Sequence, residues 1–235
     1  MEGYGENCMI CGEGLVYFEA ARKLSCHTCG KEAMTNACCE QGHFICDACH
    51  GEAGFLLISR YAGEGSSRNP MEIATEMMKN PGIPMHGPEH HYLVAASLLA
   101  AYANAGGRAD RSKALHRILE RARNVPGGIC GMWGSCGAGI STGIFWSVIT
   151  GATPLSQKEW SQANGLTAKS LARIAAHGGP RCCKRNSYLA IMQGAAAIEE
   201  QLGVSLELPR EIACEFSRRN QECKKAACLF YANEI

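Results

Sequence analysis

Cysteine spacing near the amino terminus constrains the fold of this chain more than any other feature. Eight of the first fifty residues are cysteines, and six of them form three Cys-x-x-Cys pairs. A two-residue spacer lets both thiolates of a pair reach one tetrahedral metal ion from a single tight turn, and two pairs complete one site. Because residues 1–50 contain little apolar sequence, we expect this segment, termed the knuckle, to fold only around metal.

The second half of the knuckle, CCEQGHFICDACH (38–50), adds a fourth pair of candidate ligands with the spacing C-x3-H-x2-C-x2-C. The knuckle thus offers enough ligands for two structural zinc ions: Cys8, Cys11, Cys26, Cys29, Cys39, His43, Cys46 and Cys49. Iron–sulfur clusters use the same kind of pair and are the alternative occupant. The spacing leaves open whether neighbouring or alternating pairs share an ion.

Bulk composition narrows the class of protein. The 235 residues carry 23 Lys plus Arg and 22 Asp plus Glu, so no nucleic-acid footprint is evident. The longest apolar run, 93–103, is too short to cross a bilayer, and residues 1–8 lack the pattern of a signal peptide. We therefore expect a cytoplasmic metalloprotein without membrane association, and its fifteen cysteines suggest the reducing interior of an anaerobe.

The remainder of the chain predicts helices. Residues 51–69 are expected to form a connecting helix and a Gly/Ser-rich linker, and residues 70–235 an α-helical domain, so the fold class is mainly α. Capping and stop signals place helices at 70–79, 88–104, 110–124, 156–164, 167–178 and 184–202, with a last helix starting at Pro209.

Three motifs in this helical part carry reactive side chains. MHGPEHH (85–91) places His86, Glu89 and His90 at the start of a helix, where they can act as general bases or metal ligands. GGICGMWGSCGAGISTG (127–143) and GGPRCCKRN (178–186) contribute four cysteines in glycine-rich turns: Cys130, Cys136, Cys182 and Cys183. Cationic neighbours in the third motif are expected to lower the thiol pKa there.

Two of these motifs resemble iron–sulfur serine dehydratases and the related cysteine desulfidases. Ser135-Cys136-Gly137-Ala138-Gly139 is similar to the family's Gly-bounded cysteine before a helix of small residues. Pro180, Cys182, Arg185 and Asn186 resemble its Pro-Cys-x-x-Arg-Asn stretch, with one extra residue after the proline. The family's second cysteine and its Ser-rich catalytic domain are absent, so the resemblance implies a cluster-binding helical domain more than a particular reaction.

The order of motifs along the whole chain resembles an uncharacterised family of cysteine-rich proteins from methanogens and other anaerobes. The shared order is the Cys-x-x-Cys knuckle, GH-x-x-C-D-x-C-H, H-G-P-E-H-H, C-G-x-W-G-x-C-G and G-G-P-R-C-C-K-R. This resemblance implies an architecture and no activity.

These observations lead to one leading hypothesis and two alternatives. In the first, a [4Fe–4S] cluster held by Cys130, Cys136, Cys182 and Cys183 acts as a Lewis acid in a lyase or desulfidase of sulfur metabolism. Arg181, Lys184 or Arg185 would then hold the carboxylate of a small anionic substrate, and His86, Glu89 or His90 would move the proton. The alternatives are a metal- or sulfur-carrying adaptor that docks a protein through the knuckle, and vicinal-thiol redox chemistry.

A last group, CEFSRRNQECKKAAC (214–228), contains Cys214, Cys223 and Cys228. On one unbroken helix their side chains would not share a face. Either the helix breaks near Asn220 and they converge on a metal, or they are core thiols. The sequence does not indicate the substrate or the oligomeric state.

Overall fold

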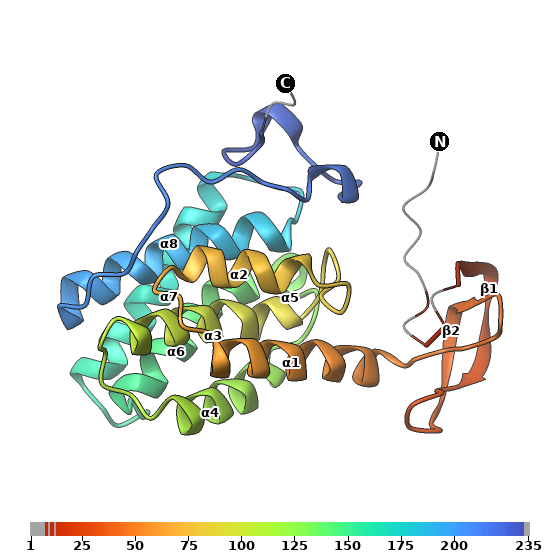
Figure 1. Ribbon diagram of the computed structural model, residues 1–235, viewed down its shortest axis with the longest axis horizontal. Coiled ribbons are helices and arrows are strands. Elements are labelled where there is room, and N and C mark those ends of the chain that lie inside the picture. Colours follow the sequence, from red (N-terminus) through yellow and green to blue (C-terminus); the bar gives the residue numbers. More distant parts are fainter. Residues whose placement is uncertain (1–7, 9, 12, 233–235) are drawn as a thin grey trace. The chain divides into compact units, whose positions relative to one another are not determined.

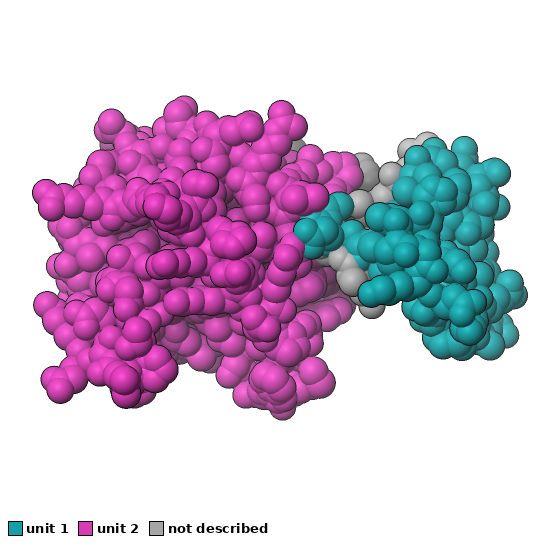
Figure 2. Space-filling view, turned by 90° about the horizontal axis from the view of Figure 1, so that it is seen from below, with its two compact units in different colours: residues 1–54 teal, residues 55–235 magenta. Residues whose placement is uncertain are grey.

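The computed structural model describes residues 8, 10–11 and 13–232. Contacts divide the chain into two compact units, residues 1–54 and 55–235, which Figure 2 colours separately. The first unit contains the cysteine-rich knuckle, and the second is helical. A knuckle followed by an α-helical domain is the fold class that the sequence predicts.

The knuckle is built on an antiparallel hairpin of two strands, β1 (Leu15–Ser25) and β2 (Glu32–Cys39). The register pairs Leu15 with Cys39 at one end and Ser25 with Glu32 at the other, and it shifts between Tyr17 and Arg22. The turn that joins the strands contains the second Cys-x-x-Cys pair, and the Cys39–His43 pair begins at the last residue of β2. The hairpin therefore sets which ligand pairs meet.

The helices follow in the order drawn in Figure 1. Their bounds are α1 (Asp47–Glu64), α2 (Pro70–Lys79), α3 (Glu89–Asn104), α4 (Arg111–Arg123), α5 (Ile129–Met132), α6 (Gly137–Thr150), α7 (Lys158–Ala176) and α8 (Cys183–Leu202), and two 3₁₀ turns follow at Ser217–Arg219 and Lys225–Ala227. No helix within the described residues combines the length and the apolar character that spanning a membrane requires.

Helix α3 is the centre of the helical unit. It packs against α2, α4, α6 and α8, and every residue from Glu89 to Tyr102 is buried. The apolar run at 93–103 is therefore a core helix enclosed by other helices. Close approach depends on small residues, because a Cβ added at Gly194 of α8 would lie 2.5 Å from Cδ1 of Leu98 on α3.

The ends of several helices lie where capping residues in the sequence predict them. Asn69 caps α2 by accepting hydrogen bonds from the backbone N–H groups of Met71 and Glu72, with Pro70 in the first turn. Asp110 caps α4 through the N–H of Lys113, and Gly203 ends α8 in the left-handed conformation. These capping predictions are confirmed.

Three of the predicted helices are not found as predicted. A single helix, α7, replaces the predicted pair at 156–164 and 167–178, because Thr167 bonds the carbonyl of Ala163 inside the helix and does not cap a new one. No helix begins at Pro209. The described residues after α8 run without regular structure apart from the two 3₁₀ turns and a bridge between Cys214 and Tyr231.

Candidate metal centres and cavity

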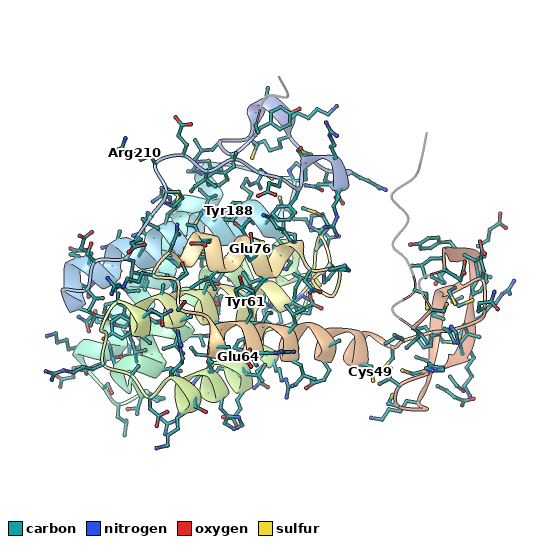
Figure 3. The ribbon with its side chains drawn as sticks, in the orientation of Figure 1. Cys49, Tyr61, Glu64, Glu76, Tyr188 and Arg210 are labelled. Atoms are coloured by element: carbon teal, nitrogen blue, oxygen red, sulfur yellow. The ribbon has the colours of Figure 1, made fainter. Side chains whose placement is uncertain are left out.

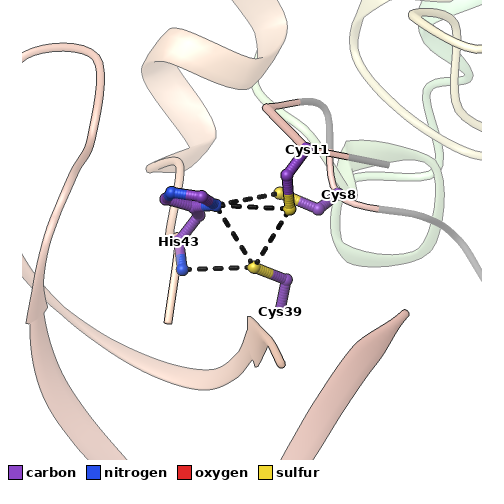
Figure 4. Close-up of side chains that lie close together, drawn as sticks. All are labelled: Cys8, Cys11, Cys39 and His43. Carbon is purple, nitrogen blue, oxygen red and sulfur yellow. Dashed lines mark hydrogen bonds between the residues drawn. The ribbon is translucent and has the colours of Figure 1, made fainter. Parts of the chain in front are cut away.

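The first metal-ligand group of the knuckle joins Cys8, Cys11, Cys39 and His43, whose ligand atoms all lie within 4.8 Å of one another (Figure 4). Nδ1 of His43 lies 3.4 Å from Sγ of Cys11 and 3.5 Å from Sγ of Cys39. The sulfurs of Cys11 and Cys39 are 3.7 Å apart. The single imidazole contributes nitrogen, so the group offers a Cys₃His donor set.

The second group joins Cys26 and Cys29, from the hairpin turn, to Cys46 and Cys49. The sulfurs of Cys29 and Cys46 are 3.7 Å apart. His27, beside this group, contacts the His43 ring of the first group edge-to-face at a centroid distance of 4.8 Å. The two groups are therefore neighbours, and Cys29 rather than His27 belongs to the second one.

Ligand pairs alternate between the two groups. The first and third pairs along the chain form one group, and the second and fourth form the other, so the pairing is a cross-brace. Tetrahedral coordination at a metal–sulfur distance of about 2.3 Å separates two sulfurs by about 3.8 Å. The observed 3.7 Å separations match this value, so both groups are compatible with a single bound ion such as zinc.

Backbone N–H groups favour a thiolate in each group. Although burial opposes it, hydrogen bonds from the backbone of Cys11 and Ile10 lower the pKa of Cys8 to about 6. The backbone N–H of Cys46 is the main cause that lowers the pKa of Cys26 to about 6. Conversely, hydrogen bonding to Cys29 raises the pKa of Cys49 to about 12. A bound cation would remove the remaining protons.

A cavity of about 210 Å³ lies in the helical unit, where α3, α6 and α8 all begin. This volume is several times the share of one water molecule in the liquid, about 30 Å³. Three imidazoles and three thiols are in its lining: His86, His90, His91, Cys130, Cys136 and Cys183. The three motifs singled out in the sequence thus meet at one place.

The imidazoles each use one nitrogen for orientation. Nδ1 of His90 donates to the carbonyl of Gly87 at 3.1 Å, and Nδ1 of His91 donates to the carbonyl of Val125 at 3.0 Å. Nε2 of His86 contacts Oδ1 of Asn220 and Oε2 of Glu222. In His90 and His91 the partner is a carbonyl oxygen and burial lowers the pKa of the ring, so the second ring nitrogen carries the lone pair. In His86 and His90 that nitrogen is buried without a hydrogen-bond partner.

Hydrogen bonds from the first turn of α8 account for three residues of the GGPRCCKRN motif. Lys184 is fully buried and donates to the carbonyl of Pro84, which fixes the loop before α3. The guanidinium of Arg185 donates to the carbonyls of Gly178 and Pro180. Nδ2 of Asn186 donates to Sγ of Cys136 at 3.3 Å. The motif therefore ties α8 to the segments that carry the histidines and Cys136.

Some of the predicted residues lie elsewhere. Arg185 is engaged by backbone carbonyls, and Arg181 is the arginine in the cavity lining. Glu89 is buried in the first turn of α3, outside the lining. Cys182 is the N-cap of α8 and lines a second cavity together with Cys214, Cys223 and Cys228.

The prediction of a lowered thiol pKa for the Cys182–Cys183 pair is wrong, because burial outweighs the lowering effect of the charges on Arg185 and Lys184. Burial raises the pKa of Cys183 to about 11 and raises that of Cys182. His91 of the MHGPEHH motif was not among the selected site residues, and Asn186 was not predicted to be a partner of Cys136. Both stand inside motifs that were recognised, so their position beside a reactive residue was the available signal.

Comparison with known proteins identifies a family for the helical part. The model of a family described as "Family of unknown function (DUF5714)" matches residues 58–231. No curated protein and no solved structure matches the chain.

Proposed function

The chain belongs to the family of unknown function DUF5714, and we propose that this member is a metalloenzyme whose helical cavity holds an iron–sulfur cluster and a small anionic substrate. The reaction would be an elimination or a desulfuration. The observation that carries the proposal is the convergence of three thiols and three oriented imidazoles on one cavity. The two knuckle groups would bind structural zinc.

The donor set in the cavity fits a cluster. Cys130, Cys136 and Cys183 supply three thiols, one fewer than the four ligands of a complete [4Fe–4S] site. The described ligand atoms here form no group within 4.8 Å, in contrast to the knuckle, so a single tetrahedral ion is not favoured. With three ligands, a bound cluster would supply a Lewis acid for a leaving hydroxyl or thiol.

Positive potential in the cavity supports an anionic substrate. The amino-terminal turns of α3, α6 and α8 all contribute to the lining, and each carries the positive end of a helix dipole together with unpaired N–H groups. Arg181 adds a guanidinium at the same cavity. We expect a substrate carboxylate to bind against these groups, with Arg181 as the one of the three cationic candidates from the sequence that lines the cavity.

His90 is the best placed proton acceptor. Its side chain is buried, and burial, followed by the nearby charge of Lys184, holds its pKa well below the usual value. The imidazole is therefore neutral, and its unpartnered Nε2 can accept a proton. Removal of the α-proton and departure of the β-hydroxyl or β-thiol with its bonding electrons would form an enamine, which hydrolyses to a keto acid and ammonia.

Metal analysis after anaerobic purification tests the cofactor. We expect zinc at two ions per chain from the knuckle, and iron with sulfide that Cys183→Ala reduces by one cluster while zinc is unchanged. Cys38→Ala is the matched control, because Cys38 is half-buried and belongs to neither knuckle group. A wild-type protein with zinc but no iron would overturn the proposal.

Catalysis is tested with small amino acids as probes. We expect keto acid release from L-serine or sulfide release from L-cysteine, and a loss of roughly 10²–10⁴-fold in kcat for His90→Gln with iron content retained. Arg181→Gln should raise KM more than it lowers kcat, because it removes binding and not proton transfer. Full activity in His90→Gln would show that another group takes the proton.

A docking role for the knuckle is the second candidate function. Tyr17 and Met34 are large apolar side chains on the hairpin and are 68% and 64% exposed. Such side chains suit contact with a protein partner. Retained metal content together with loss of a copurifying partner in Tyr17→Ser would support this role, and an unchanged set of copurifying proteins would count against it.

A further inference from the structure

The cysteines after α8 meet one cysteine of the GGPRCCKRN motif in a second cavity of the helical unit. Its lining contains Cys182, Cys214, Cys223 and Cys228. Met85, Tyr188, Phe216 and Phe230 supply apolar side chains around them, and Figure 3 labels Tyr188 on α8. The residues that line this cavity include no histidine, aspartate or glutamate, so the donor set is all thiol.

Backbone and side-chain N–H groups point at these sulfurs as they do in the knuckle. The N–H of Phe216 donates to Sγ of Cys214 at 3.4 Å, and that of Lys225 donates to Sγ of Cys223 at 3.3 Å. The same two-residue step occurs in the knuckle, from Ile10 to the candidate ligand Cys8. N–H groups of this kind stabilise thiolates that bind metal.

Cys182 also accepts hydrogen bonds from N–H groups. Its sulfur accepts a hydrogen bond from the backbone N–H of Arg185 at 3.4 Å and one from Nδ2 of Asn220 at 3.6 Å. Asn220 is buried, and it lies between the two 3₁₀ turns that separate Cys214 from Cys228. No α-helix spans residues 214–228, and the three carboxyl-terminal cysteines line one cavity together with Cys182, which is the arrangement that convergence on a metal requires.

The spacing of the four sulfurs distinguishes this group from the knuckle. They are close enough for Cys182, Cys228 and Cys223, after burial itself, to raise the pKa of Cys214. In the described part of the chain, however, only the two knuckle groups bring three or more ligand atoms within 4.8 Å of one another. The four sulfurs are therefore spaced more widely than the ligands of one tetrahedral ion.

We propose that Cys182, Cys214, Cys223 and Cys228 bind a [4Fe–4S] cluster with complete cysteine ligation, separate from the cluster proposed for the histidine-lined cavity. Four cysteines leave no iron open to a substrate, and the apolar lining reduces access of water. The centre would be structural or would transfer electrons. The four cysteines of this inference are not among the residues that carry the proposed function. The two sites are adjacent in sequence where Cys182 is followed by Cys183.

The test compares two alanine variants of the full-length chain, purified anaerobically and reconstituted with iron and sulfide. Cys223→Ala should lose about four irons and four sulfides per chain relative to wild type. It should keep two zinc ions and the helical circular dichroism. Cys183→Ala should lose a similar amount of iron from the other cavity, and the double variant should lose both. Cys38→Ala should match wild type.

The pattern of losses separates the two proposals. Iron lost in Cys183→Ala but not in Cys223→Ala would overturn this inference and leave the proposed function standing, and the reverse pattern would do the opposite. A third zinc in place of iron would overturn the cluster. Cys223→Ser covers the case in which the alanine variant fails to fold: the reduced protein should show an altered electron paramagnetic resonance spectrum, and a spectrum identical to wild type would refute ligation by Cys223.

Discussion

Helices α3 and α8 both begin at the first cavity, and the contact between them sets the distance between their first turns. The variant Gly194→Ala tests this contact. The added Cβ would be 2.5 Å from Cδ1 and 3.0 Å from Cδ2 of Leu98, whereas carbon atoms in contact are about 3.5–4.0 Å apart. Leu98 is fully buried. The helices must therefore separate or the leucine must leave its rotamer.

The expected magnitude combines two opposing effects. Overpacking a core costs about 1–3 kcal/mol, and replacing glycine by alanine inside a helix returns about 1 kcal/mol. We therefore expect the free energy of unfolding to fall by about 1 kcal/mol in Gly194→Ala. Gly165→Ala is the matched control, because Gly165 is exposed on α7 and a Cβ there meets nothing within 4 Å. That variant should gain about 1 kcal/mol.

Thermal unfolding followed by helical circular dichroism measures the difference. For a unit of this size, 1 kcal/mol corresponds to about 2–4 °C in Tm, and Gly194→Ala should melt below wild type while Gly165→Ala melts above it. In a Leu98→Ala background the penalty at Gly194 should disappear, because the clashing methyl groups are gone. A Gly194→Ala protein as stable as Gly165→Ala would refute the close α3–α8 contact.

Three further predictions concern the cap, a buried tyrosine and the knuckle. Asn69→Ala should lower the free energy of unfolding by about 1 kcal/mol, because two backbone N–H groups lose their acceptor. Urea unfolding measures the difference, and an unchanged free energy would mean that α2 needs no side-chain cap. Burial raises the pKa of the Tyr92 hydroxyl above its ordinary value of 10.0. The hydroxyl therefore loses its proton at a lower pH in the unfolded chain than in the folded chain, and the free energy of unfolding should fall as the pH rises above 10. Tyr92→Phe should flatten that decline in a series of urea midpoints, and an unaltered slope would contradict it. Chelation of the knuckle metals should abolish the dispersed amide resonances of β1 and β2 while helical circular dichroism persists, and dispersed resonances in the metal-free protein would contradict metal-dependent folding.

Local signals in the sequence were sufficient for the helix ends and for the ligand types of the knuckle. Asn69, Asp110 and Gly203 act within a few residues of their own position, so no tertiary information is needed to interpret them. The same holds for Cys-x-x-Cys spacing, because one tight turn places both sulfurs. By contrast, Thr167 resembles a cap in sequence, and only the packing of α7 against Gly143 shows that it lies inside a helix.

Pairing between distant ligands could not be predicted, because it depends on the hairpin. The register that places Cys39 opposite Leu15 brings the third ligand pair to the first and leaves the turn cysteines for the fourth. The hairpin itself escaped prediction because neither β1 nor β2 alternates apolar and polar residues as a half-buried strand does. In this small unit two groups of candidate metal ligands stand where an apolar face would usually reveal a strand.

Adjacent cysteines were the other source of error. Cys182 and Cys183 were expected to serve one centre, but Cys182 is the N-cap of α8, with φ −148° and ψ 104°, and Cys183 is the first helical residue. The change from extended to helical backbone between them directs one thiol to each cavity. Adjacency in sequence therefore marks a boundary between two sites in this chain.

The same boundary links the two proposed centres. Asn220 accepts from Nε2 of His86 in the first cavity and donates to Sγ of Cys182 in the second, so one amide contacts groups from both. Asn186 likewise donates to Cys136 one turn beyond Cys183. All fifteen cysteines lie in the described residues, and Cys38 alone is outside the two knuckle groups and the two cavities. Fourteen of the fifteen cysteines are therefore grouped in space, and if both cavities hold the proposed clusters, the short path through Cys182 and Cys183 would let the oxidation state of one cluster influence the other cavity.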